Sequence, residues 1–260
     1  MKQLKLSGII PACVLTWNPN DTIDEPGLRK YIRWLARYKL GGAAVNADTG
    51  EGPMLTFDEK INVVEIWKEE VKAKFPVIGG LYAINTKDAV QQAKELKKAG
   101  ADALLVFPHP AFAEKPLRWK IPYDYYAEIG EKADIPLVAF QLHGELGVGA
   151  IFDDFTLRKL ISLKHLVALK DASFDAKIFY RTLRTIQTAD RRIALLTGND
   201  NFIFESFALG ADGGLIGFGT VLVREQIEMF NAVKRGNLRQ AEILNYKLMK
   251  AVDVIFSSPV

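Results

Sequence analysis

Apolar runs of strand length alternate with amphipathic, helix-like segments along almost the whole chain. The apolar runs lack regular polar alternation, which is typical of strands buried on both faces of a parallel sheet. The predicted strands are 8–15, 42–46, 76–81, 101–107, 135–142, 166–170, 193–197 and 214–218. The predicted helices are 26–38, 57–71, 86–98, 123–132, 155–163, 176–188, 201–209, 224–235 and 238–255, with Thr86 as the N-cap of the third.

Eight strands that are each followed by a helix predict a parallel sheet with right-handed crossovers. Eight such units fit a closed α/β barrel, the (β/α)8 TIM barrel, better than an open doubly wound sheet. No Gly-x-Gly-x-x-Gly follows the first strand and no Walker loop occurs, so nucleotide-binding folds gain no support. We expect the barrel over residues 1–222. Residues 223–260 would hold the last barrel helix and a short C-terminal helical appendage, with a break at Gly236-Asn237.

Composition excludes several classes of protein. Of the 260 residues, 49% are hydrophobic and 25% are charged, which is ordinary for a soluble globular protein. The net charge is +3 and no basic block occurs, so a nucleic-acid partner is not expected. No apolar run reaches the roughly 18 residues of a membrane helix, so no membrane partner is expected. The single cysteine, Cys13, lies in an apolar run and fits the core of a cytoplasmic protein.

In such a barrel, the active site lies at the carboxyl ends of the strands. Lys170 ends the sixth predicted strand, where burial of its amine would lower the pKa. A neutral lysine can attack a carbonyl group and form a Schiff base. A lysine in solvent or in a structural ion pair with Asp171 is the alternative interpretation. The position of Lys170 therefore makes it a candidate nucleophile.

Other strand ends also carry polar groups or glycine. The turn Asp48-Thr49-Gly50-Glu51 offers a hydroxyl and consecutive N–H groups that could bind a carboxylate, although an ordinary Asx turn also fits. Gly198 would let the backbone approach a ligand, or it is a βα-turn glycine with Asn199 or Asp200 capping the next helix. His109 and His143 could shuttle protons. His165, at the opposite end of the barrel, is expected to be structural. No spacing typical of a zinc site occurs, so we expect no metal.

These strand ends, in this order, resemble those of the dihydrodipicolinate synthase/N-acetylneuraminate lyase family. The motifs that carry the resemblance are Ala47-Asp48-Thr49-Gly50-Glu51, Ala168-Leu169-Lys170-Asp171, Gly198-Asn199-Asp200 and Gly210-Ala211-Asp212-Gly213. The resemblance implies a homotetramer or homodimer that needs no cofactor. It implies that Lys170 forms a Schiff base with pyruvate or a longer 2-oxo acid, and that Thr49 and its neighbouring N–H groups bind the carboxylate. The expected substrate-contacting residues are Asp48, Gly50, Phe140, Gly198, Ile216 and His109.

Several positions depart from the pattern of the family. The catalytic tyrosine that ends strand five is Phe140 here, and phenylalanine has no hydroxyl to relay a proton. The arginine of the following loop is Glu145, a reversal of charge. The paired tyrosines after strand four are His109 and Pro110, and the lyase-type serine after strand eight is Phe218. These changes argue against dihydrodipicolinate synthase and against sialic acid lyase proper.

Two interpretations are open. In the first, the chain is a class I Schiff-base lyase of the aldolase or dehydratase type, acting on another 2-oxo acid, with His143 or His109 in place of the missing tyrosine. In the second, the barrel has lost turnover and binds a small carboxylate as a sensor or scaffold. The presence of both Lys170 and the Asp48–Glu51 turn favours the enzyme.

Overall fold

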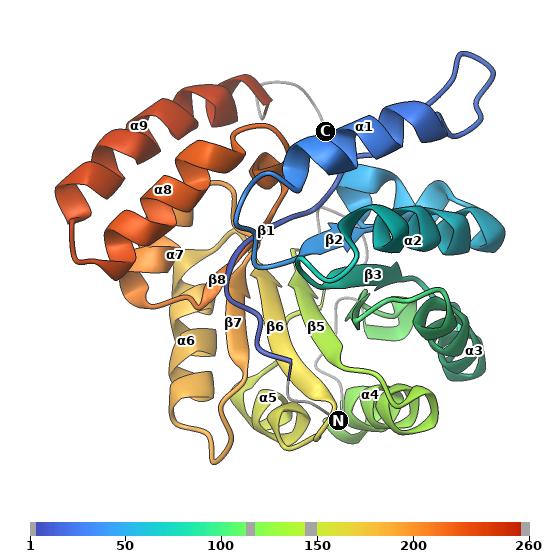
Figure 1. Ribbon diagram of the computed structural model, residues 1–260. Helices are drawn as coiled ribbons and strands as arrows, with labels where there is room; N and C mark the ends of the chain where they lie inside the picture. Colours follow the sequence, from blue (N-terminus) through green and yellow to red (C-terminus); the bar gives the residue numbers. More distant parts are fainter. Residues whose placement is uncertain (1–3, 113–117, 144–149, 256–260) are drawn as a thin grey trace.

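Residues 4–112, 118–143 and 150–255, which this computed structural model describes, form eight strands that alternate with helices (Figure 1). The strands are β1 (Gly8–Pro11), β2 (Ala43–Val45), β3 (Val77–Leu81), β4 (Ala103–Val106), β5 (Leu137–Leu142), β6 (Leu166–Ala172), β7 (Ala194–Thr197) and β8 (Gly213–Ile216). The helices are α1 (Glu25–Leu35), α2 (Phe57–Val71), α3 (Thr86–Lys98), α4 (Lys120–Ala133), α5 (Asp154–Ile161), α6 (Ala176–Gln187), α7 (Ile203–Leu209), α8 (Val223–Lys234) and α9 (Leu238–Ile255).

The sheet has the strand order β1-β8-β7-β6-β5-β4-β3-β2, and every neighbouring pair is parallel. A parallel bridge between Ala12 and Ala44 joins the two ends of this order. The N–H of Cys13 donates to the carbonyl of Ala44 at 2.8 Å, which strengthens the same connection. The strands therefore form the (β/α)8 barrel that their alternation with helices predicts.

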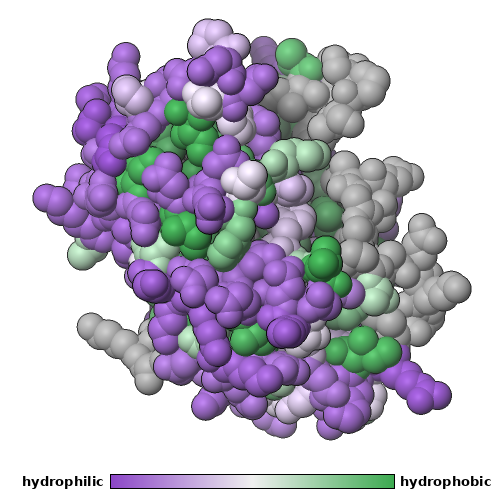
Figure 2. Space-filling view, turned by 90° about the vertical axis from the view of Figure 1, so that its right-hand side faces the viewer, coloured by the Kyte–Doolittle hydropathy of each residue, from purple (hydrophilic) through white to green (hydrophobic). Residues whose placement is uncertain are grey.

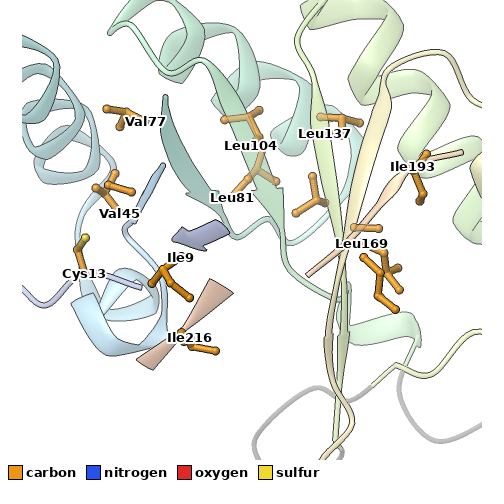
Figure 3. Packing of buried hydrophobic residues seen from close by; sticks show 14 of the residues in the cluster. Ile9, Cys13, Val45, Val77, Leu81, Leu104, Leu137, Leu169, Ile193 and Ile216 are labelled. Atoms are coloured by element: carbon orange, nitrogen blue, oxygen red, sulfur yellow. The ribbon is translucent and has the colours of Figure 1, made fainter. Parts of the chain in front are cut away.

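Apolar side chains of each strand enter two separate layers. The inner layer contains residues from the strands and their ends, among them Ile10, Ile78, Leu105, Val138, Leu196 and Leu215. The outer layer joins strand and helix residues, and Figure 3 shows part of it, including Ile9, Val45, Val77, Leu104, Leu137 and Leu169. Successive residues of a strand point to opposite faces. Both faces are buried, which explains why the strands read as continuous apolar runs.

Several element ends differ from the predictions. β6 continues past Lys170 to Ala172, because the polar side chain of Asp171 is hydrogen-bonded within the protein and the ladder does not stop there. β1 ends at Pro11 instead of residue 15, and Gly217–Thr220 form a 3-10 helix instead of extending β8 to residue 218. Further 3-10 turns were not predicted, because a single turn leaves no periodic pattern. These turns are Asp48–Gly50, Gly52–Met54 and Pro110–Phe112.

Helix α3 begins at Thr86 as predicted, but the assignment of Thr86 as its N-cap was wrong. The N-cap is Asn85, whose backbone is extended and whose side chain accepts a hydrogen bond from the N–H of Asp88 at 2.9 Å. An asparagine oxygen satisfies a free N–H of the first turn at least as well as a threonine hydroxyl does. The cap therefore lies one residue earlier than the pattern suggested.

The last two helices lie side by side outside the barrel, and α9 also contacts α7 (Figure 1). Gly236, with a φ of 74°, stands in the predicted break between them. The outer face in Figure 2 is mainly hydrophilic, with hydrophobic residues in scattered patches. None of the helices within the described ranges has the length and apolar character of a transmembrane span.

Candidate active site

The side chain of Lys170 points into the barrel interior, on the same face of β6 as Ala168 and Ala172. Only 7% of the residue is exposed. Its register partner in β5 is Phe140, and Nζ lies 4.1 Å from the centroid of that ring. Burial lowers the pKa of Lys170, and the charges of Asp48 and Asp200 partly oppose this effect. This amine therefore holds its proton less tightly than a lysine in water does.

Asp171, the neighbour of Lys170, faces the other side of the strand. Its buried carboxylate accepts hydrogen bonds from Gln141 Nε2 at 2.8 Å and from Ser173 Oγ at 2.7 Å. A third bond comes from Asn199 Nδ2 at 3.2 Å. The geometry therefore supports neither a solvent-exposed Lys170 nor an ion pair between Lys170 and Asp171, because the lysine is buried and the carboxylate of Asp171 is hydrogen-bonded to other residues.

Gly198 follows β7 and lies against the aliphatic part of Lys170. A Cβ atom at this position would stand 2.7 Å from Cε of Lys170 and 3.1 Å from Cβ of Ala172. The N–H of Gly198 donates to the carbonyl of Asp171 at 2.6 Å, which fixes the turn against β6. The missing side chain at position 198 therefore makes room for the lysine.

The turn Asp48–Gly50 is attached to the segment after β1. Thr49 Oγ1 donates a hydrogen bond to the carbonyl of Ala12, so the proton of this hydroxyl is already engaged. A Cβ at Gly50 would stand 2.6 Å from the carbonyl oxygen of Cys13, which explains the need for glycine. A carboxylate bound at this turn would use backbone N–H groups, or it would draw the Thr49 hydroxyl away from Ala12.

Asp200 lies in the turn after β7; the sequence placed it in the Gly198-Asn199-Asp200 motif and suggested it as a helix cap, but not as a site residue. The residue before α7 is instead Phe202, which makes no side-chain cap. The Asp200 carboxylate accepts from the N–H groups of Gly217 at 3.4 Å and Phe218 at 3.3 Å. A Cβ at Gly217 would stand 3.5 Å from Asp200 and 3.4 Å from Thr49, so these three residues are neighbours.

Burial raises the pKa of Asp200 to about 6, and this shift gives a prediction for stability. The ordinary aspartate pKa is about 3.9, so the folded chain binds the proton more tightly and stability falls as the pH rises from about 4 to about 6. At pH 8, the free energy of unfolding of Asp200→Asn, measured by urea titration, should therefore exceed that of the wild type by about 3 kcal/mol. The difference should shrink towards pH 4. An equal difference at both pH values would contradict this explanation.

The two predicted histidines have different surroundings. His109 Nδ1 accepts from the N–H of Ala111 at 3.0 Å, so the neutral ring carries its proton on Nε2, 3.1 Å from the carbonyl of Ile84. Both ring nitrogens thus join loops, which favours a positioning role for His109. His143 directly follows β5, is partly buried, and donates its backbone N–H to the carbonyl of Ala172 at 3.0 Å. Glu145 lies outside the described residues.

At the end of β8, the predicted residue Ile216 places its side chain in the outer layer, as does Phe218. Ile216 is fully buried there, and its carbonyl accepts from the N–H of Ala12 at 3.0 Å. The side chains at these two positions therefore pack against helices. Any contribution of Ile216 to a ligand at the barrel mouth would come from its backbone.

Aromatic side chains from three strand ends form a connected group beside Lys170. Tyr82 directly follows β3 and stacks on Phe107, with ring centroids 3.7 Å apart. Phe107 meets Phe140 edge to face at 5.0 Å. Tyr82 was not among the predicted site residues, although its position at a strand end was a usable signal. The structure thus brings a phenol hydroxyl to the same group of strand ends as the lysine.

Comparisons with known proteins agree with this architecture. The chain matches the model of the dihydrodipicolinate synthetase family over residues 5–260. The 4-hydroxy-tetrahydrodipicolinate synthase of Methanothrix thermoacetophila is 30% identical over 250 residues, which are 96% of this chain and 81% of that protein. The protein of the same name from Thermodesulfovibrio yellowstonii is 31% identical over 227 residues, covering 87% of this chain and 75% of that protein.

Solved structures match almost the whole chain. A structure described as the first monomeric dihydrodipicolinate synthase variant has a TM-score of 0.90 and 25% identity, covering 99% of this chain and 84% of that chain. The Acinetobacter baumannii dihydrodipicolinate synthase complexed with pyruvate has a TM-score of 0.88 and 24% identity, covering 98% and 84%. At this identity, the second likeness shows a shared fold.

Proposed function

Because the chain belongs to the dihydrodipicolinate synthetase family, a family of lyases, we propose that it is a class I lyase whose Lys170 forms a Schiff base with pyruvate or a longer 2-oxo acid. The observation that carries this proposal is the buried amine of Lys170, which lies 4.1 Å from the ring of Phe140 and has a lowered pKa. The pyruvate bound to the A. baumannii protein supports this class of substrate.

In the proposed reaction, the lone pair of Lys170 Nζ attacks the keto carbon, and the keto oxygen leaves as water. The resulting iminium withdraws electrons from the neighbouring carbon, as an aldolase- or dehydratase-type lyase requires. The Asp48–Gly50 turn would hold the carboxylate through its N–H groups. Gly198 keeps Lys170 in place, and Asp200 contributes a carboxylate that is partly protonated near pH 6.

We further propose that the substrate differs from those of dihydrodipicolinate synthase and sialic acid lyase proper. Phe140 supports this, because the residue beside Lys170 on the neighbouring strand carries no hydroxyl. The relatives named above carry the synthase name, and they support the reaction class but not a particular second substrate. From the family resemblance we also infer a homotetramer or homodimer.

Reductive trapping tests the proposed function. The protein is incubated with pyruvate and a panel of 2-oxo acids, reduced with borohydride, and measured by intact-mass spectrometry and peptide mapping. We expect one reduced adduct, on Lys170, and the acid that is trapped fastest identifies the substrate class. A folded protein that gives no adduct with any acid would contradict the proposal and favour a barrel that binds carboxylates without turnover.

A further inference from the structure

Tyr82 and Asp48 form a hydrogen-bonded pair at the barrel mouth. The phenol of Tyr82, which follows β3, donates to the carboxylate of Asp48 in the turn after β2. Tyr82 is half-buried and Asp48 is exposed, so the pair lies where the interior meets solvent. The mechanism described above gives neither side chain a role in moving protons.

A continuous set of contacts links this pair to Lys170. Tyr82 stacks on Phe107, which packs against Phe140, and the ring of Phe140 lies 4.1 Å from the lysine amine. The negative charge of Asp48 raises the pKa of Lys170 and so partly offsets the effect of burial. Asp48 also precedes Thr49, at the proposed carboxylate site. The phenol, the amine and the carboxylate site therefore belong to one region.

We propose that Tyr82 is the acid–base residue of imine formation, with Asp48 as the group that takes up and returns its proton. The proposal rests on the proposed function of Lys170 as the nucleophile. Tyr82, at the end of β3, would then perform the proton transfer that Phe140 cannot perform. The substrate class it requires is a 2-oxo acid whose ketone reaches Lys170.

Imine formation through this pair moves protons between the Lys170 nitrogen, Tyr82, Asp48 and the keto oxygen. Nζ attacks the keto carbon, giving an alkoxide and a cationic nitrogen. One proton leaves the nitrogen for the Tyr82 oxygen, while the phenol proton passes to Asp48. The alkoxide takes a proton from solvent, and the resulting hydroxyl then receives the phenol proton as Asp48 returns its own. Water leaves, the nitrogen lone pair closes the C=N bond, and the pair regains its starting state with one solvent proton consumed.

The charges around Tyr82 suit such a concerted transfer. Burial raises the pKa of Tyr82, and the neighbouring Asp48 carboxylate raises it further, so a free phenolate is unfavourable. Moving the phenol proton to Asp48 at the same moment avoids a phenolate beside a carboxylate. Lys60 Nζ lies 5.9 Å from the centroid of the Tyr82 ring and adds a positive charge near the pair.

The test compares the rate of borohydride-trapped adduct formation with pyruvate in the wild type, Tyr82→Phe and Asp48→Asn. Tyr82→Phe keeps the ring on Phe107, and Asp48→Asn keeps a hydrogen-bond acceptor but cannot take up a proton. Each variant should form the same Lys170 adduct about 10²-fold more slowly. The double variant should be no slower than the single ones, because the two groups act as one unit.

Matched variants separate this role from a structural one. Tyr126→Phe removes a buried phenol from α4 that contacts the carbonyl of Val106, and it should keep the wild-type trapping rate. An unchanged trapping rate in Tyr82→Phe, or a larger loss of rate in His143→Ala than in Tyr82→Phe, would overturn the role of Tyr82. Either result would leave the role of Lys170 as nucleophile intact. Absence of an adduct in the wild type would overturn the function of Lys170 and this assignment together.

Discussion

Lys170→Ala is expected to yield no borohydride-trapped adduct and to lower turnover of the identified 2-oxo acid by about 10³-fold or more, because the amine forms the covalent bond. Lys170→Arg should fail equally, since a guanidinium keeps the positive charge but is not deprotonated in proteins. Intact-mass spectrometry after reduction measures the adduct, and steady-state kinetics measure the turnover.

Two further measurements make this result specific. Lys39→Ala removes an exposed lysine and should leave the adduct on Lys170 unchanged. The free energy of unfolding of Lys170→Ala should stay close to that of the wild type, because the loss of buried contacts is offset by the removal of a poorly solvated amine. Full turnover in a folded Lys170→Ala protein would eliminate the Schiff-base mechanism.

Gly198→Ala is expected to slow adduct formation by about 10²-fold, because a misplaced catalytic group loses its orientation. The added Cβ would stand 2.7 Å from Cε of Lys170, and the flexible lysine would give way more readily than the backbone. The thermal unfolding midpoint should change much less than the trapping rate. Borohydride trapping with pyruvate at a series of times measures the rate of adduct formation, and a thermal melt measures the unfolding midpoint.

The matched control for this change is Gly79→Ala on β3. A Cβ there meets its nearest neighbour, Cδ2 of Leu104, at 3.5 Å, an ordinary contact distance. This variant should trap pyruvate at the wild-type rate. If Gly198→Ala behaves like Gly79→Ala, then the space beside Lys170 does not control its orientation.

The strands and the placement of Lys170 on a buried strand could be predicted because both leave a local pattern. Continuous apolar runs reflect burial on both faces, and Lys170 interrupts such a run. The strand ends were less accurate, because hydrogen bonds to a partner strand decide where a ladder stops. β6 shows this at Asp171, a charged residue that stays inside the sheet because Gln141 and Ser173 satisfy its carboxylate.

The remaining site residues depend on contacts between distant segments. The sequence identifies His109 as a titratable group at a strand end, but it does not reveal that Ala111 and the carbonyl of Ile84 occupy both ring nitrogens. The proposed role of Tyr82 rests on its hydrogen bond to Asp48, and no spacing in the sequence predicts that pair. The resemblance to a family also directs attention to Phe140, where the hydroxyl is missing, and away from β3.

The position of Lys170 within β6 also matters for redesign. Phe140 of β5 and Leu196 of β7 flank it in register, so this lysine belongs to the ordered ladder instead of a loop. The turns that carry Asp48 and Asp200 are separate segments from β6. If Lys170 forms the proposed Schiff base, libraries that randomise these turns should broaden the range of accepted aldehydes or leaving groups during directed evolution, while the amine of Lys170 keeps its place.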